Sequence, residues 1–244
     1  MGHPNISSME GFSSSVLDDM DLETGNIGIR DTMDEYWKNE FGFINELQSL
    51  VEKWISQISL FRIAPKKKEL IGNSSDYFFT FNYTNTLEDV YHIDNVMHIH
   101  GSIGENAISE PIMGHCNRSE IEKHRKLRYE ADEKYDEGGA SINATISDYL
   151  EMIFKDTTSL ISLYSRYFAR LSTVNQIFII GWSAGDVDIP YLHKIKNSVS
   201  KDAKWTVYYY NELAKESIES AFKKIGILDA YESEFLSTEE FWDK

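Results

Sequence analysis

The stretch that decides the fold is residues 77–101, which read YFFTFNYTNTLEDVYHIDNVMHIHG. Two short runs within it, 77–82 and 96–100, are rich in aromatic and branched side chains and predict strands. Between them, residues 84–92 match a short helix, with Asn85 as its N-cap and an acidic residue three positions on. A strand, a helix and a second strand in this order predict a βαβ unit with parallel strands.

The same alternation continues towards the end of the chain. Further strands are expected at 110–114, 176–180 and 205–210, and helices at 37–58, 146–171, 188–199 and 214–225. Residues 119–139 are expected to form an inserted helix and loop. Residues 237–240 (STEE) form a capping box for a last short helical turn. The sequence therefore predicts an α/β fold, with a Rossmann-like, mostly parallel sheet and helices on both faces.

The chain also shows a change of character along its length. Residues 1–30 are polar and acidic without a sustained period, which predicts an irregular leader. Residues 31–244 are expected to form a single domain with a helical insertion around 119–172. The apolar stripe of the helix at 37–58 is typical of packing, and partner binding is the alternative.

The composition is that of a globular protein of 244 residues, with 41% hydrophobic and 26% charged side chains. A formal net charge of -16 argues against general nucleic-acid binding and against docking on anionic membranes. The single cysteine, Cys116, cannot form an internal disulfide, and no cysteine–histidine spacing predicts a metal site. No run approaches the roughly 20 apolar residues of a membrane span, and no targeting signal is recognised. We therefore expect a cytoplasmic protein.

Small, polar and titratable side chains follow the predicted strands, at the edge where open parallel sheets bind ligands. Asparagine, histidine, serine and aspartate gathered at strand ends predict a binding pocket. The candidate residues are Asn82, Thr84, Asn85, His100, Gly101, Ser102, His115, Gly181, Ser183 and Asp188.

Each candidate also has a purely structural explanation. Asn82 can form a turn with its own backbone. Asp188 can cap the helix that follows it, with Pro190 early in that helix. His98 and His100 lie two apart, on one face of a regular strand, where a histidine can serve as a hydrogen-bonded structural residue. The prediction of a site therefore rests on the whole set.

Four motifs occur in a fixed order. They are residues 81–88 (FNYTNTLE), 98–101 (HIHG), 113–115 (MGH) and 181–191 (GWSAGDVDIPY). In this order they resemble the bacterial abortive-infection family AbiH over roughly residues 35–230, so residues 31–244 are expected to form an AbiH-like domain. The segment 95–101 (NVMHIHG) is also similar to the catalytic segment of sirtuins and of sirtuin-like NAD-consuming defence domains.

The resemblance implies a Rossmann-like fold that binds NAD, and a role in anti-phage defence. Asn82 would orient the ribose or the attacking water, and His100 would act as the general base. The other candidates would bind NAD, which would be the substrate, and no metal ion is implied. The resemblance leaves room for a homo-oligomer and for a phage-derived trigger as partners.

Two functions stay open at this point. The first is cleavage of the nicotinamide–ribose bond of NAD through Asn82 and His100. The AbiH pattern opens with a strand and a glycine-rich phosphate loop, whereas residues 25–28 (GNIG) follow no predicted strand, so both elements are expected to be missing. The alternative is therefore a non-catalytic defence module, truncated relative to its family, that binds a nucleotide or a partner. The net charge disfavours a nuclease.

Overall fold

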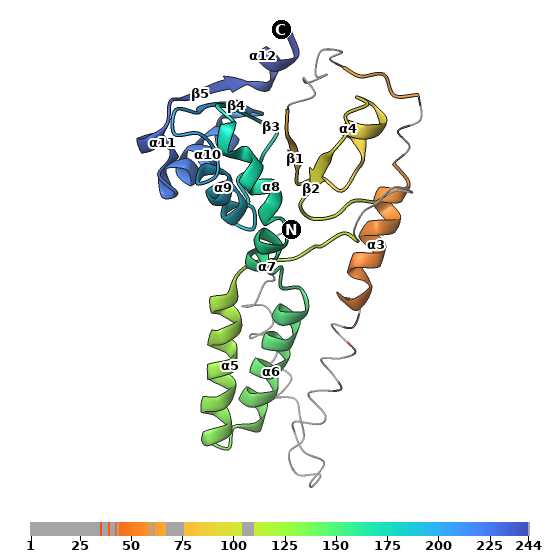
Figure 1. The fold of residues 1–244 in the computed structure, drawn as a ribbon. Helices are drawn as coiled ribbons and strands as arrows, with labels where there is room; N and C mark the ends of the chain where they lie inside the picture. The colour runs from red at the N-terminus through yellow and green to blue at the C-terminus, as the bar shows by residue number, and fades with distance from the viewer. Residues whose placement is uncertain are drawn as a thin grey trace. The chain divides into compact units, whose positions relative to one another are not determined.

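A computed structural model of the chain describes residues 44–58, 60, 62–66, 76–103 and 110–243, together with positions 35, 39 and 42 (Figure 1). The predicted acidic leader and the turn at 25–28 lie outside the described residues. The chain divides into two compact units. Unit 1 comprises Met1–Trp54 and Met113–Lys155, and unit 2 comprises Ile55–Ile112 and Asp156–Lys244. The prediction of a single domain with an insertion stays a prediction.

The described strands all belong to unit 2 and all pair in parallel. They form two short sheets, one with the order β1–β2 and one with the order β3–β4–β5. Their bounds are Phe78–Thr80 for β1, Val96–His98 for β2, Gln176–Ile180 for β3, Lys204–Tyr209 for β4 and Ser233–Ser237 for β5. The α/β prediction is confirmed at this level, whereas a single Rossmann-like sheet stays a prediction.

Unit 2 contains seven described α-helices and one 3-10 turn, of which α10 is the longest. They are α4 (Thr86–Asp89), α7 (Thr157–Leu163), α8 (Ser165–Arg170), the 3-10 turn η2 (Leu171–Thr173), α9 (Ile189–Lys196), α10 (Glu212–Lys224), α11 (Ile227–Ala230) and α12 (Thr238–Asp243). The predicted capping box begins α12, since the Ser237 amide donates to Glu240 Oε1 at 3.1 Å and the Glu240 amide donates to Ser237 Oγ at 3.3 Å. A further helix, α3 (Ile44–Ser56), ends at the boundary between the two units in the sequence.

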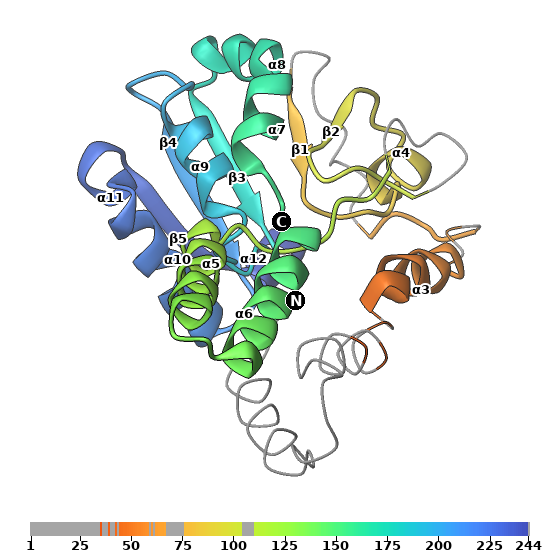
Figure 2. The same cartoon turned by 90° about the horizontal axis from the view of Figure 1, so that it is seen from below.

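The core of unit 2 lies on one face of the three-stranded sheet. Trp205 and Val207 of β4 are 1% and 0% exposed, and Trp205 packs against Phe222 of α10 at 5.7 Å between ring centroids. The opposite face carries Tyr208, whose ring lies 5.0 Å from that of Phe241 in α12. Helices therefore contact both faces, with α9 and α10 on one side and α12 on the other (Figures 1 and 2).

One strand departs from the pattern of a buried sheet. Ile180 of β3 pairs in register with Tyr208, so it shares the face of Tyr208, yet it is 40% exposed. Phe178, two residues earlier on the same face, is 58% exposed. β3 is also an end strand of its sheet within the described part of the chain.

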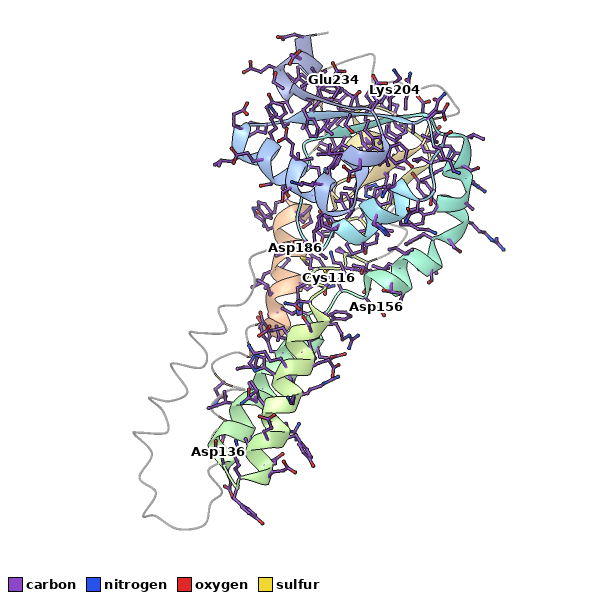
Figure 3. The ribbon with its side chains drawn as sticks, turned by 90° about the vertical axis from the view of Figure 1, so that its left-hand side faces the viewer. Cys116, Asp136, Asp156, Asp186, Lys204 and Glu234 are labelled. Carbon is purple, nitrogen blue, oxygen red and sulfur yellow. The ribbon has the colours of Figure 1, made fainter. Side chains whose placement is uncertain are left out.

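Unit 1 contains a helical hairpin, formed by α5 (Arg118–Glu133) and α6 (Glu137–Met152) (Figures 1 and 3). Asp136 lies at the turn between the two helices, and its carboxylate caps α6 by accepting from the Gly139 amide at 2.9 Å. Ile121, Ile146 and Leu150 form the core of the hairpin. The hairpin therefore has its own small hydrophobic core.

Three secondary-structure predictions are wrong. Residues 110–114 form no strand; the Ile112 amide donates to His100 O at 2.8 Å without extending a ladder. The helix predicted at 146–171 is divided among α6, α7 and α8, because the Asp156 carboxylate caps α7 by accepting from the Ser159 amide at 3.0 Å. β5 has no predicted counterpart, since its sequence SEFLS carries too few apolar side chains to show an alternation.

Candidate functional site

Asn82 lies two residues beyond β1, and both its amide and its carbonyl are hydrogen-bonded. Its amide donates to Thr80 Oγ1 at 3.0 Å, and its carbonyl oxygen accepts from Nδ1 of His98 at 3.0 Å. The residue is nevertheless exposed, so its carboxamide is presented to solvent. A fixed backbone below an exposed amide is what a group that orients a ligand needs.

His98 is the last residue of β2 and joins this loop to α4. Its second ring nitrogen, Nε2, lies 2.8 Å from Oε1 of Glu88. Asn85 does occupy the N-cap position of α4, but its side chain makes no capping hydrogen bond, and Glu88 contacts His98 and not the cap. Asn85 therefore occupies the predicted N-cap position, but its side chain does not cap α4.

His100 lies two residues beyond β2 and is only 3% exposed. Its ring packs against two aromatic rings, Phe81 at 5.5 Å and Tyr191 of α9 at 5.3 Å between centroids. Ser102 is also buried, at 6% exposed, and the Gly101 amide donates to His98 O at 3.1 Å. The turn after β2 thus packs His100 against Phe81, which precedes Asn82, and against Tyr191 of α9.

Asp188 is buried after β3, with 8% of its surface exposed. Its Oδ2 accepts a hydrogen bond from Nε1 of Trp182 at 3.2 Å. It occupies the N-cap position of α9 as expected, but it makes no capping hydrogen bond. Burial and, secondarily, the negative charge of Asp188 raise the pKa of Tyr83 to about 12, so Tyr83 and Asp188 lie near each other.

Tyr83 connects these loops further. Its hydroxyl donates to Ile112 O at 2.9 Å, and its carbonyl accepts from the Ile103 amide at 2.7 Å. Thr84, the next residue, forms an isolated parallel bridge with Ile103 and shares a 2.9 Å hydrogen bond with Thr86. The loops that follow β1, β2 and β3 therefore meet through the two neighbours of Asn82, since Phe81 contacts His100 and Tyr83 lies near Asp188.

The remaining candidates lie at the edge of this group or outside it. Gly181 and Ser183 are exposed on the loop after β3. His115 belongs to unit 1, where Nδ1 accepts from the Asn117 amide at 3.1 Å. Nε2 therefore carries the proton of the neutral ring and donates to Leu150 O at 2.9 Å. Both ring nitrogens of His115 thus hold the hairpin together.

Comparison with models of known families gives one match, to the bacteriophage abortive infection family AbiH, over residues 9–209. The match covers well over half of the 244 residues. The chain belongs to the AbiH family. Membership indicates an abortive-infection defence role. No curated protein and no solved structure matches the chain.

Several residues of this AbiH chain that build the site were not among the candidates drawn from the sequence. They are Tyr83, Glu88, His98, Trp182 and Tyr191. All five lie inside the motif segments 81–88, 98–101 and 181–191, so their proximity to the candidates was a usable signal. Trp182 and Tyr191 were harder to single out, because aromatic side chains are more often core residues than site residues.

Among the described residues of the AbiH chain, no helix has both the length and the apolar character needed to cross a membrane. No group of three or more histidine, cysteine, aspartate or glutamate side chains within the same residues is arranged to hold a metal ion.

The raised pKa of Tyr83 gives a testable pH dependence. An Asp188→Asn variant keeps an oxygen that accepts from Trp182 but removes the negative charge, so the pKa of Tyr83 should fall below about 12 and stay above 10.0 because burial persists. The ¹³Cζ shift of Tyr83 measures this directly, with Asp186→Asn as the control. An unchanged Tyr83 titration in the Asp188 variant would contradict the assignment.

The same shift predicts how stability depends on pH. Since the pKa is higher in the folded protein, the contribution of Tyr83 is fully present below pH 10 and is lost as the pH rises from 10 to about 12.

Proposed function

We propose that this AbiH protein acts in abortive infection by hydrolysing the nicotinamide–ribose bond of NAD. The observation that carries the proposal is Asn82, whose backbone is bonded on both sides while its carboxamide is exposed. The ends of β1, β2 and β3 supply His100 and Asp188 around the same loops. Ligands of open parallel sheets bind at such strand ends.

The proposed reaction breaks the bond between the ribose carbon C1′ and the nicotinamide nitrogen, and nicotinamide leaves with the bonding electrons. A water oxygen forms the new bond to C1′, and its proton passes to the ring of His100. The carboxamide of Asn82 orients the water or the ribose. As nicotinamide departs, positive charge develops on the sugar, which fixed dipoles stabilise more effectively than water does. The products are ADP-ribose and nicotinamide.

The other candidates of unit 2 bind the substrate in this proposal. Asp188 and Ser183 contact ribose hydroxyls or a phosphate from the loop after β3. Asp188 is suited to a hydroxyl, because carboxylate oxygens accept hydrogen bonds and its Oδ2 is held in place by Trp182. The remaining contacts would come from Thr84, Asn85, Gly101, Ser102 and Gly181. His115 is not included, since both of its ring nitrogens bond within unit 1.

A second candidate function is a non-catalytic module that binds a nucleotide or a partner. It is favoured by the burial of His100, which is 3% exposed and packs against Phe81 and Tyr191. A histidine so enclosed can serve as a packing residue and need not meet a substrate. The two functions differ in turnover, which can be measured.

The decisive experiment measures nicotinamide release from NAD by the purified full chain. Asn82→Ala should lower the rate by about 100-fold, because it removes an oriented dipole at the reacting centre. Gln176→Ala is the control, since Gln176 is also exposed and carries the same carboxamide at the start of β3. Absence of release by the native chain would favour the binding module, whereas equal release by the native chain and the Asn82 variant would remove Asn82 from the reaction.

A further inference from the structure

We propose that Glu88 and His98 are positioning residues for Asn82. The inference rests on the proposed function, because it assigns the pair to the same site. The pair joins three elements: Glu88 comes from α4, His98 ends β2, and Asn82 follows β1. Nδ1 of His98 faces the Asn82 carbonyl and Nε2 faces the Glu88 carboxylate, so both contacts are hydrogen bonds when the ring carries a proton on each nitrogen.

The direction of the first bond follows from its acceptor. A backbone carbonyl oxygen can only accept, so Nδ1 of His98 carries a proton and donates to Asn82 O at 3.0 Å. The ring reaches this carbonyl because His98 pairs in register with Thr80, two residues before Asn82. The Thr80 hydroxyl accepts from the Asn82 amide. The amide and the carbonyl of Asn82 are therefore held by the side chains of Thr80 and His98, which pair across β1 and β2.

Glu88 fixes the other side of the ring. Its Oε1 lies 2.8 Å from Nε2 of His98, and the two side chains are 31% and 10% exposed. Oε2 of Glu88 is buried and has no hydrogen-bond partner among the described residues. His98 is therefore the group that satisfies this carboxylate within the described part of the chain, which makes the contact costly to break.

The arrangement restrains Asn82 without touching a ligand. With its amide and carbonyl bonded, the backbone of Asn82 is restrained, so only the side-chain torsions move the carboxamide. A ligand-orienting group displaced by about 1 Å can cost about 100-fold in rate. Loss of the His98 donor to Asn82 should therefore lower turnover while NAD affinity changes little.

A matched pair of substitutions separates this role from general packing. In His98→Asn the side-chain amide nitrogen takes the place of Nδ1, so the bond to Asn82 O is retained and the contact with Glu88 is lost. In His98→Gln the amide nitrogen takes the place of Nε2, so the contact with Glu88 is retained and the bond to Asn82 O is lost. Both variants replace the same imidazole ring of His98 with a carboxamide, so they serve as controls for each other.

The first measurement needs no enzymatic activity. The ¹⁵N heteronuclear NOE of the Asn82 and Tyr83 amides should fall in His98→Gln and stay near the native value in His98→Asn. The second measurement is nicotinamide release from NAD, for which kcat should fall about tenfold or more in His98→Gln, with KM within about twofold. His98→Asn should keep at least half of the native kcat.

The outcomes distinguish this inference from the proposed function. Native order of Asn82 in His98→Gln, or equal loss of order and of melting temperature in both variants, would overturn the positioning role. If the native chain releases no nicotinamide, the proposed function fails, and the NOE pattern alone decides whether His98 positions Asn82.

Discussion

Replacement of Gly114 by alanine is expected to destabilise unit 1 by about 4 kcal/mol. The φ angle of Gly114 is +140°, which side chains rarely adopt. A Cβ built there would lie 1.8 Å from Ile153 O and 2.8 Å from Ile153 C. Neither backbone segment can give way easily, because the His115 amide donates to Ile153 O at 3.1 Å and the Lys155 amide donates to His115 O at 2.7 Å.

The measurement is thermal unfolding followed by circular dichroism, in which the midpoint should fall by about 10 °C. Gly181→Ala is the matched control, since Gly181 also has a positive φ of +66° but a Cβ there meets nothing within 4 Å. This control should cost about 1–2 kcal/mol through backbone strain alone. Equal midpoints for the two variants would show that the close approach of Gly114 to Ile153 is not a feature of the folded protein.

The second large effect concerns His100. If His100 takes the proton from the attacking water, His100→Phe should lower nicotinamide release by about 10²–10⁴-fold. Phenylalanine keeps an aromatic ring against Phe81 and Tyr191, so packing is retained while both ring nitrogens are lost. His100→Gln complements it, because glutamine is closer to histidine in volume and stays polar but cannot act as the base. Initial rates at saturating NAD check the prediction.

The control for His100 is His193→Phe, because His193 is exposed on α9. It should leave the rate unchanged. Melting temperatures of the His100 variants must stay within a few degrees of the native value for the rates to report chemistry. A His100→Phe variant that is stable and fully active would remove His100 from the reaction and leave it as a packing residue.

Sequence reasoning located four of the strands, since aromatic and branched runs mark β1, β2, β3 and β4 directly, although the predicted ends of β1 and β2 lie two residues too far along the chain. It failed where local pattern and tertiary context disagree. Residues 110–114 are apolar enough for a strand, but they find no neighbouring ladder, and the Ile112 amide bonds to the turn that holds His100. The capping box at 237–240 was predictable because both of its hydrogen bonds are local.

The roles of individual side chains were harder to predict than their places. Asn85 and Asp188 occupy helix N-cap positions, as their spacing indicates, yet neither side chain caps. Asp188 instead accepts from Trp182, and the acidic residue of the expected α4 cap, Glu88, binds His98 across the β1–β2 pair. Trp182 lies six residues before Asp188 in the same loop, and His98 lies on β2 while Glu88 lies on α4; neither separation matches the spacing of a helix cap.

The exposed face of β3 has a consequence for handling the protein. Phe178 and Ile180 present apolar surface on an end strand, which is the kind of surface that associates between molecules. At neutral pH the net charge of -16 keeps molecules apart by mutual repulsion. Near the isoelectric point of about 4.8 that repulsion vanishes while the apolar face remains. The colloidal stability of the protein at neutral pH therefore depends on its excess of acidic residues, and its solubility minimum should lie at the pH at which negative and positive charges balance.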